Sequence, residues 1–350
     1  MRSFALTYLG WLFAVLLFQL IRYFGTPDTI AWADGPLMYA VITLVGTACL
    51  AGMDWIVNER IDRSRIRSKP YLTLIALKAG AMFVAVVLLV ILVAVATADV
   101  EGELTAAAFA AACVEAFTDP RLISVVLYVL TVTVIMVFVR QMAGMVGPRI
   151  LRELILGRYH RPKSEERIFM FLDLKGSTSH AEKLGHVRFT QLVQDCFRDL
   201  TDSVLRYDVE IYQYVGDEAI LTWILERGLV NANCLRVFHD FDARLEARRS
   251  YYEATYGLRP QFKAGVNLGP VTVAEVGVVK RDIAYLSDVL NTAARIEGMC
   301  NEVGKPLLIS ASVRERLPRV DDFQIESIGA VELRGRAGHV EVFAVARIDP

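Results

Sequence analysis

The stretch Arg167-Ile-Phe-Met-Phe-Leu-Asp173-Leu-Lys-Gly-Ser-Thr178, in the middle of the 350-residue chain, predicts the fold around it. Its apolar run, 168–172, has the length and composition of a buried β-strand and ends on the carboxylate of Asp173. A Gly-Ser-Thr turn follows, and Ser179 with Glu182 matches a capping box that opens a helix. Unpaired N–H groups at a helix start bind anions, and a carboxylate beside them can hold a divalent cation. The stretch therefore suits a nucleotide triphosphate with its metal, although an Asp that merely caps a turn explains it as well.

The composition of the whole chain indicates a membrane protein. Hydrophobic residues make up 54% of it and its mean hydropathy is +0.39, which is high for a soluble protein of this length. A net charge of -1 gives no indication of a nucleic-acid partner. The five cysteines lack Cys-x-x-Cys or Cys/His spacing, so neither a zinc site nor a disulfide framework is indicated.

Four apolar runs in the first 150 residues each approach the roughly 20 residues that cross a bilayer as a helix. They are 4–24, 36–57, 71–97 and 122–139. The loop 58–70 carries five basic residues, whereas 98–120 carries five acidic residues and no basic one. By the positive-inside rule the first loop is cytoplasmic and the second lies outside. We therefore predict a four-helix transmembrane domain over residues 1–140, with both ends of the chain in the cytoplasm.

Three features of this half allow further interpretations. The sequence Ala31-Trp-Ala33 resembles a cleavage site, so the first run could be a signal peptide, although its apolar part is long for one. Lys78 either reaches the membrane surface or lines an ion path. Residues 104–117 are Ala-rich and too short to span, which suits an interfacial helix outside the membrane.

Residues 141–166 change from apolar to basic and connect the two halves of the chain. Apolar residues recur at helical spacing over 150–155, which predicts an amphipathic connecting helix that ends at Gly157 and Pro162. Such a connector either transmits a shift of the spans or serves as a passive anchor. A soluble domain is predicted after it, over residues 167–350.

The soluble half alternates strands and helices in the order βαββαβ, which is typical of a ferredoxin-like α+β fold. The predicted elements after Asp173 are a helix over 189–205, a hairpin over 209–223, a helix over 230–249, and strands over 261–267 and 271–276 separated by a Gly-Pro turn. A strand over 307–310 and a short helix over 312–317 follow. In this topology the first strand is central and pairs with the hairpin, so Asp173 and Asp217 at the hairpin tip should be neighbours.

Two converging carboxylates beside a phosphate-binding turn suit a two-metal phosphoryl-transfer site. Taken alone, Asp217 is better explained by the turn propensity of Asp. Further along, Asn291 and Arg295 stand four residues apart and project from one helix face, where they could hold a ribose oxygen and a phosphate. Such a pair is more often a solvated face. Arg334-Gly-Arg336 near the last hairpin turn offers further triphosphate contacts.

Three motifs together resemble the class III nucleotidyl cyclases, in sequence and in order. They are Phe171-Leu-Asp173-Leu-Lys-Gly-Ser-Thr178, Tyr214-Val-Gly-Asp217-Glu218 and Asp288-Val-Leu-Asn291-Thr-Ala-Ala-Arg295. The likeness runs from about residue 158 to the C-terminus. It implies an adenylate cyclase in which the ribose 3′-hydroxyl of ATP attacks the α-phosphorus, giving 3′,5′-cyclic AMP and pyrophosphate. It also implies two Mg²⁺ or Mn²⁺ ions per site and a symmetric homodimer, in which the metal residues of one subunit face the Asn/Arg helix of the other.

By position, the resemblance implies a role for each residue of the motifs. The implied metal ligands are Asp173, Asp217 and the carbonyl of Leu174. The implied catalytic residues are Asn291, which orients the ribose, and Arg295, which stabilises the transition state. The implied nucleotide-binding residues are Gly176, Ser177, Thr178, Gln213, Ala284 and Arg336.

The positions that read the base depart from the family pattern. Gln213 stands where many adenylate cyclases have Lys, and Ala284 where they have Asp or Thr. Because Gln offers a donor and an acceptor and Ala neither, the choice between ATP and GTP stays open. The alternatives are a guanylate or relaxed-specificity cyclase and a non-catalytic nucleotide-binding membrane receptor. The predicted location is the inner membrane, with several spans and a cytoplasmic catalytic domain.

Overall fold

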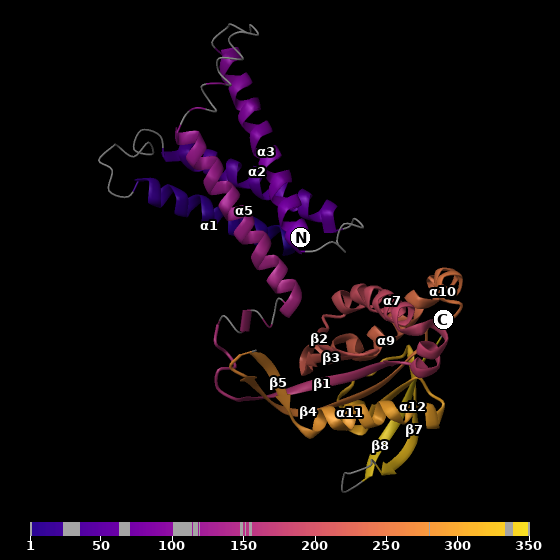
Figure 1. The fold of residues 1–350 in the computed structure, drawn as a ribbon. Helices are drawn as coiled ribbons and strands as arrows, with labels where there is room; N and C mark the ends of the chain where they lie inside the picture. Colours follow the sequence, from indigo (N-terminus) through magenta and orange to yellow (C-terminus); the bar gives the residue numbers. More distant parts are fainter. Residues whose placement is uncertain are drawn as a thin grey trace. The chain divides into compact units, whose positions relative to one another are not determined.

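The computed structural model describes residues 2–23, 36–62, 71–100, 114, 118, 120–147, 150, 152–153, 156–279, 281–332 and 339–348. The chain forms two compact units, Met1–Val146 and Gly147–Pro350 (Figure 1). The domain limits predicted from the sequence are residues 140 and 166 instead.

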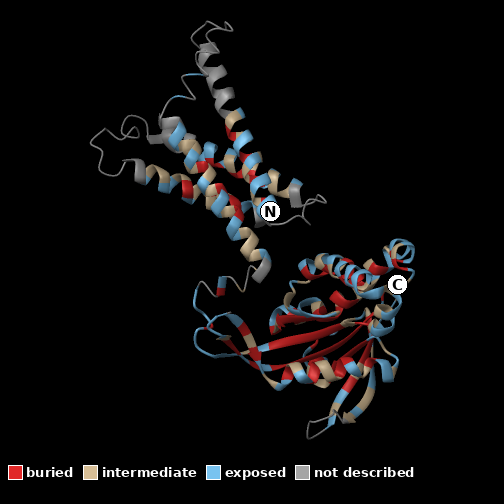
Figure 2. Ribbon diagram, viewed as in Figure 1, coloured by how far each residue is buried: buried red, intermediate tan, exposed pale blue. Residues whose placement is uncertain are grey.

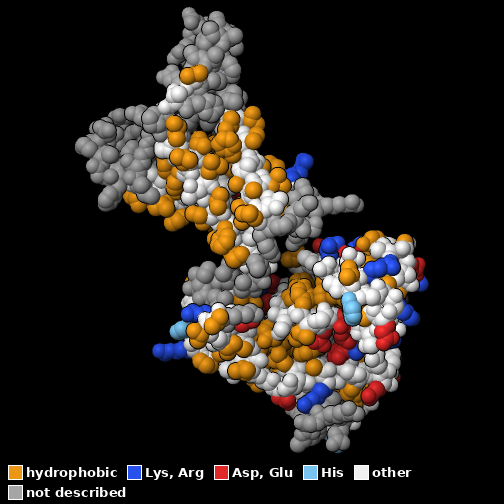
Figure 3. All heavy atoms as spheres, in the orientation of Figure 1, with side chains coloured by type: hydrophobic (Ala, Val, Ile, Leu, Met, Phe, Trp, Pro, Cys, Tyr) orange, Lys and Arg blue, Asp and Glu red, His pale blue; other side chains and the backbone are white. Residues whose placement is uncertain are grey.

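The first unit is built from four long helices that cover the four apolar runs of the sequence. They are α1 (Arg2–Tyr23), α2 (Pro36–Asp62), α3 (Tyr71–Val100) and α5 (Pro120–Val146). Their contacting faces bury a small core of Trp11, Ala51, Met82, Val86 and Val129. Hydrophobic side chains cover much of the visible outer face as well (Figure 3). Apolar side chains lie both in the core of this bundle and on its outer surface. Surface helices of a soluble protein differ, because each of them has one polar face.

Within the described residues of this unit, one stretch is long and apolar enough to cross a membrane, Ile123–Gly144 in α5. The apolar stretches Thr7–Leu20 and Leu72–Leu88 are shorter. The four predicted runs are thus helical, but the criterion for a membrane span is met by one of them. Lys78 is buried in the unit, with 5% of its surface exposed. The predicted interfacial helix at 104–117, residues 63–70 of the basic loop and Ala31-Trp-Ala33 lie outside the described residues, apart from Val114.

A network of hydrogen bonds around Asp54 ties three of these helices together. Asp54 of α2 is 3% exposed and accepts from Trp11 Nε1 of α1 at 3.2 Å and from Asn58 Nδ2 at 2.7 Å. Arg140 of α5 donates to both of its carboxylate oxygens, at 3.1 and 2.8 Å, and also to Thr7 Oγ1 at 3.0 Å. The carboxylate therefore has donors for both oxygens, as a buried charge requires.

The connection between the units is helical in part. Ile150, Arg152 and Glu153 are helical, while the other residues of the predicted connecting helix, 151 and 154–155, lie outside the described residues. A turn over 156–159, with Gly157 at φ 62°, follows as predicted. Tyr159, within the second unit, then joins strand pairing there, because its carbonyl accepts a hydrogen bond from the Glu275 N–H at 2.9 Å.

The second unit is a mixed β-sheet with helices on both faces (Figure 1). Its strands are β1 (Lys163–Leu174), β2 (Glu210–Val215), β3 (Glu218–Ile224), β4 (Phe262–Val276), β5 (Asp282–Leu286), β6 (Leu307–Ser310), β7 (Phe323–Glu332) and β8 (His339–Arg347). Its helices are α7 (Ser177–Arg206), α8 (Leu225–Leu229), the 3₁₀ turn η2 (Val230–Ala232), α9 (Asn233–Ala247), α10 (Arg249–Tyr256), α11 (Asp288–Gly298), α12 (Cys300–Val303) and α13 (Ala311–Arg316).

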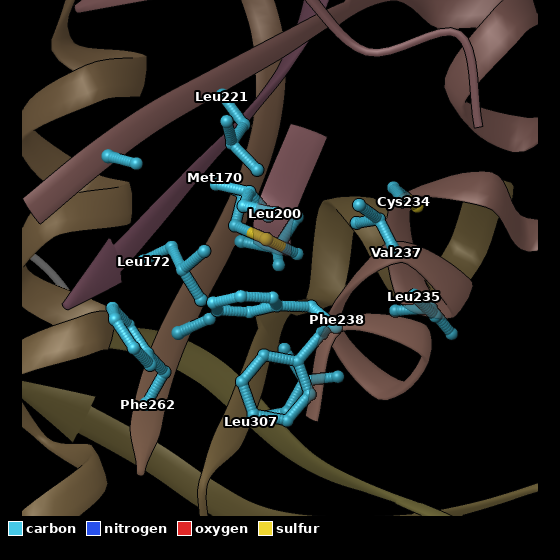
Figure 4. Close-up of a cluster of buried hydrophobic side chains, with 14 of the residues drawn as sticks. Met170, Leu172, Leu200, Leu221, Cys234, Leu235, Val237, Phe238, Phe262 and Leu307 are labelled. Carbon is cyan, nitrogen blue, oxygen red and sulfur yellow. The ribbon is translucent and has the colours of Figure 1, made fainter. Parts of the chain in front are cut away.

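The sheet order is β2-β3-β1-β4-β6-β8-β7, with β5 paired to β4. The predicted α+β fold with the order βαββαβ is therefore confirmed, and β1 is central, between β3 and β4. Alternate residues of β1 enter two cores. Met170 and Leu172 point toward Phe238 of α9 and Phe262 of β4 (Figure 4), whereas Phe169 and Phe171 pack on the other face of the sheet, beneath α11. Burial on both faces explains why the central strands β1, β3, β4 and β6 are largely buried (Figure 2).

Two helix predictions were wrong in detail. The capping box at Ser179 and Glu182 does not start a helix, because α7 already begins at Ser177, after Gly176 in the left-handed region at φ 72°. The helix predicted over 230–249 is α9, with short helical pieces before and after it.

The Gly-Pro turn predicted between two strands is absent from the described chain, because β4 runs continuously through Gly269 and Pro270. Pro270 lacks an N–H, but it lies between the part of β4 that pairs with β6 (264–266) and the part that pairs with β5 (272–276). No ladder bond is lost on that edge. Gly269 is required for packing, since a Cβ there would lie 2.8 Å from Cγ2 of Val289 in α11.

Candidate active site

Asp173 and Asp217 come together at the end of the central strands. Asp173, near the end of β1, pairs with Glu218 of β3, and Asp217 precedes Glu218 in the tight turn after Gly216. Gly216 has φ 63°, a conformation that this turn requires and glycine adopts easily. The topology thus makes the two carboxylates neighbours, as expected. Asp173 is half-buried, with 23% of its side chain exposed.

Several acidic side chains lie close together where Asp173 and Asp217 meet. Burial raises the pKa of Asp173, and the Asp217 carboxyl adds to the rise while the Lys263 ammonium opposes it. Burial, together with the charges of Asp173, Glu297 and Asp217, raises the pKa of Glu218 to about 7. Burial also raises the pKa of Glu297, against the opposing hydrogen bond from Lys263. Four carboxyl groups thus share one ammonium, an excess of negative charge that a cation would relieve.

Asp217 and Leu174 offer ligand atoms that suit a divalent cation. Oδ2 of Asp217 is buried and, within the described part of the chain, has no hydrogen-bond partner. The side chain of Leu174 is a buried hydrocarbon without donor atoms, so this residue could bind a cation only through its carbonyl. The described residues contain no cluster of three or more His, Cys, Asp or Glu side chains placed as metal ligands. Two carboxylates and a carbonyl leave the other positions to water and phosphate, as is usual for Mg²⁺.

The start of α7 lies directly after this point. Gly176 precedes its first turn, and no side chain caps the N–H groups there. Ser177 is half-buried and Thr178 exposed. A cavity of about 280 Å³ adjoins the turn, and its lining contains the basic residues Lys175, Arg259, Lys263 and Lys305 and one acid, Asp242, which is paired with Arg259. Open N–H groups beside a basic cavity form an anion-binding environment.

Helix α11 carries Asn291 and Arg295 on the face that looks away from the sheet. The helix starts at Ser287, whose Oγ accepts from the Val289 N–H at 3.2 Å. Its opposite face packs on Gly265, where a Cβ would lie 2.5 Å from the Ala293 carbonyl and even closer to the Glu297 nitrogen. Residues 291 and 295 are each two positions, about 200°, away from these contacts. Asn291 is exposed, and NH1 of Arg295 is a buried donor with no partner among the described residues.

The two positions that would read the base lie on strands that meet. Gln213 is exposed on β2 and Ala284 is half-buried on β5. Their neighbours in sequence, Tyr212 and Tyr285, are in contact, with ring centroids 4.9 Å apart. Arg336, the remaining predicted residue, lies outside the described residues.

Sequence reasoning missed Lys263 and Glu297. Lys263 faces Asp173 across the β1–β4 ladder, and its Nζ lies 3.2 Å from Asp173 Oδ2 and also contacts Glu297 Oε1. The pKa of Lys263 is raised, because the hydrogen bond and charge of Glu297, and those of Asp173, outweigh the lowering by burial. The signal was present in sequence: Lys263 is a charged residue in the apolar run from Phe262 to Val266, a position that requires a buried partner.

The comparison with protein families agrees with this geometry. The family model "Adenylate and Guanylate cyclase catalytic domain" matches residues 160–347, more than half of the chain. The chain belongs to this family. The match contains the three motifs and every described residue of the candidate site.

Individual relatives carry the same kind of name. "Adenylate cyclase 2" of Rhizobium meliloti (strain 1021) is 36% identical over 233 residues, which are 66% of this chain and 64% of that protein. "Adenylate cyclase" of Anabaena cylindrica is 24% identical over 187 residues, 50% of this chain and 36% of that protein. The chain thus spans less than two thirds of the length of these relatives. A solved "Structure of a bacterial light-regulated adenylyl cyclase" aligns at 24% identity and a TM-score of 0.46, over 52% of this chain and 91% of that one.

Proposed function

We propose that the protein is a membrane-bound adenylate cyclase that converts ATP into 3′,5′-cyclic AMP and pyrophosphate. The observation that carries the proposal is the meeting of Asp173 and Asp217 beside the uncapped start of α7, with Asp217 Oδ2 left without a partner among the described residues. Family membership and the 36% identity to a protein named "Adenylate cyclase 2" support it.

In this proposal the chain's own groups bind and orient the nucleotide. Asp173, Asp217 and the Leu174 carbonyl would hold the divalent cations, two per site, and the N–H groups around Gly176, Ser177 and Thr178 would hold the phosphates. When bound, Mg²⁺ or Mn²⁺ lowers the pKa of a hydroxyl and neutralises phosphate charge. The adjoining cavity gives room for the phosphate tail.

Asn291 and Arg295 would complete the site from a second subunit. Asn291 would orient the ribose so that its 3′-oxygen faces the α-phosphorus. The free NH1 of Arg295 would donate to the phosphate oxygens as their charge grows and the bond to pyrophosphate breaks. Arg336 remains a proposed triphosphate contact on family grounds alone.

The direction of α11 supports a two-fold homodimer. Asn291 and Arg295 face away from the sheet that carries Asp173, so a site that combines them with Asp173 and Asp217 would need two copies of the chain. The hairpins next to the site expose apolar side chains, Tyr214, Val215 and Leu286, that a partner would cover. Mixing inactive Asp173→Ala chains with inactive Arg295→Ala chains should restore about a quarter of the wild-type rate, because half of the dimers would hold one intact site. Mixtures that stay inactive would contradict the shared site.

We further propose that the first unit spans the inner membrane several times, with the catalytic unit in the cytoplasm. Apolar side chains such as Leu9, Phe13, Leu72 and Leu127 are more than half exposed on its helices, which suits lipid contact. The basic loop 58–70 supports the orientation. The chain should stay in the membrane pellet after alkaline carbonate extraction, and protease added from the outside should leave the catalytic unit intact. Release into the supernatant would contradict the proposal.

Assays of the purified full chain with ATP and with GTP, in Mn²⁺, test the activity. We expect cyclic AMP and pyrophosphate in equal amounts and a higher kcat/KM for ATP. Because exposed Gln213 can donate or accept, a guanylate or relaxed-specificity cyclase is the second candidate, and a GTP preference would establish it. Nucleotide binding without any cyclic product would instead favour a non-catalytic receptor.

A further inference from the structure

Lys263 lies between two carboxylates that belong to different parts of the site. Its Nζ is 3.2 Å from Oδ2 of Asp173, on β1, and in closer contact with Oε1 of Glu297, on α11. Asp173 and Lys263 project from the face of the sheet that α11 covers, and Glu297 projects from α11 itself. The Lys263 and Glu297 side chains are 11% and 10% exposed, so water can contribute little to the solvation of their charges.

An ammonium in this place competes with a metal ion for Asp173. Because Lys263 is buried, its charge needs an anionic partner. The structure offers two, Asp173 and Glu297, and an Asp173 carboxylate neutralised by Lys263 would bind a divalent cation less tightly. The balance between the two partners therefore sets how much negative charge Asp173 can offer.

Glu297 is held firmly where it meets Lys263. Its backbone nitrogen abuts Gly265 of β4, so closely that no side chain fits at Gly265. Lys263 is two residues before Gly265 on the same strand and therefore on the same face. Strand and helix thus fix the base of both side chains, and the Lys263–Glu297 ion pair follows from that packing.

We propose that Glu297 is a positioning residue: it retains the Lys263 ammonium and so leaves Asp173 available to a divalent cation. The inference rests on the proposed function, because it takes Asp173 as a metal ligand. Glu297 itself touches neither metal nor nucleotide in this scheme. In this scheme Glu297 acts on Asp173 through Lys263, in addition to the direct repulsion between the two carboxylates.

The test measures Mn²⁺ binding to the detergent-solubilised full chain without nucleotide, by electron paramagnetic resonance of the free ion. The Asp173→Ala variant identifies which bound Mn²⁺ belongs to this site. Glu297→Gln should weaken that binding about tenfold or more, because the ammonium then pairs with Asp173. The double variant Glu297→Gln/Lys263→Met should recover the wild-type affinity, since the competing charge is gone. A residue that only supports the fold would not show this recovery.

The surface pair Lys305–Glu326, at 3.2 Å, provides a matched control. Glu326→Gln removes the same kind of charge and should leave Mn²⁺ binding unchanged. If Glu297→Gln does not fold, Lys263→Met alone decides, because we expect it to bind Mn²⁺ at least as tightly as the wild type. Weaker binding in Lys263→Met, wild-type binding in Glu297→Gln, or a double variant as weak as Glu297→Gln would each overturn the inference. Absence of site-specific Mn²⁺ binding in the wild type would instead remove the metal assignment of the proposed function.

Discussion

The two units each bury a carboxylate next to a basic side chain, and they differ in how completely those groups are hydrogen bonded. In the helical unit, Asp54 receives donors on both oxygens from Trp11, Asn58 and Arg140. In the catalytic unit, Oδ2 of Asp217 and NH1 of Arg295 are buried without partners among the described residues. A buried carboxylate is costly to leave unpaired, so donors on both oxygens of Asp54 indicate a structural role, whereas the open oxygen of Asp217 indicates a place for a ligand.

The largest effect should come from removing the two carboxylates that are proposed to bind metal, Asp173 and Asp217. Asp173→Ala and Asp217→Ala should each lower cyclic AMP formation by about 10³-fold or more, because the metal that polarises the phosphates would be lost. Thermal unfolding should change little, since each substitution relieves repulsion among the acids. The control is Asp208→Ala, an exposed residue paired with Arg227, which should keep full activity. Activity within tenfold of wild type in either site variant would show that the carboxylates are not metal ligands.

Arg295 should show the next largest effect, and in kcat rather than KM. Arg295→Ala should lower kcat about 100-fold with KM changed only a few-fold, because the guanidinium would act on charge that develops in the transition state. Arg295→Lys should recover only part of the rate, since it keeps the charge without the forked geometry. A rise in KM at constant kcat would instead assign Arg295 to ground-state binding.

Asp54 should behave in the opposite way to Asp173. Asp54→Asn should lower the free energy of unfolding by about 2 kcal/mol, because Arg140 loses its anionic partner, while Mn²⁺ binding at Asp173 stays unchanged. Adding Arg140→Gln should return part of that stability. Thermal unfolding of the full chain gives the first quantity and Mn²⁺ titration the second. Weakened Mn²⁺ binding in Asp54→Asn would blur the distinction between the two networks.

The smallest effect concerns His239, whose buried Nε2 has no partner within the described chain but whose ring is uncharged. Burial lowers the pKa of His239 from 6.5 to about 4. The unfolded chain therefore takes up a proton below pH 6.5 while the folded chain does not, so stability is complete above pH 6.5 and falls toward pH 4. From pH 7.5 to pH 5.5 the loss should be about 1 kcal/mol.

His239→Phe tests this pH dependence, because it keeps an aromatic ring between Phe238 and Phe323. Urea unfolding of the variant should lack that part of the decline with pH. An unchanged decline would assign it to other groups. Loss of the decline in the variant would distinguish the neutral, unpaired nitrogen of His239 from the charged, unpaired groups of the site.

Much of the catalytic fold was readable from local patterns in the sequence. The apolar run before Asp173 and the hairpin around Gly216 each carry their own signal, and the βαββαβ order places them side by side. The break predicted at Gly269 and Pro270 was wrong, because tertiary pairing decides whether Pro270 interrupts a strand. Its edge of β4 is unpaired at that point, which no local pattern reveals.

Only those residues of the candidate site that belong to sequence motifs could be predicted. Asp173 and Asp217 follow from the topology, and Asn291 and Arg295 from helical spacing. Lys263 and Glu297 do not belong to one local pattern, and their contact exists only because α11 lies directly on β4. Glu218 belongs to the Tyr214–Glu218 motif, but its place opposite Asp173 appears only in the ladder. Contacts between distant segments are what a single sequence conceals.

The glycines beneath α11 also limit how the enzyme can be regulated. With no side chain at Gly265 or Gly269, α11 packs directly on the backbone of β4. No flexible side chains lie between them at these positions that would let the helix shift along the strand. In the proposed dimer, an upstream stimulus would then have to move one whole protomer relative to the other instead of shifting a single helix. Insertions for biosensor engineering would accordingly belong in the connection before β1, and the α11–β4 contact should be left untouched.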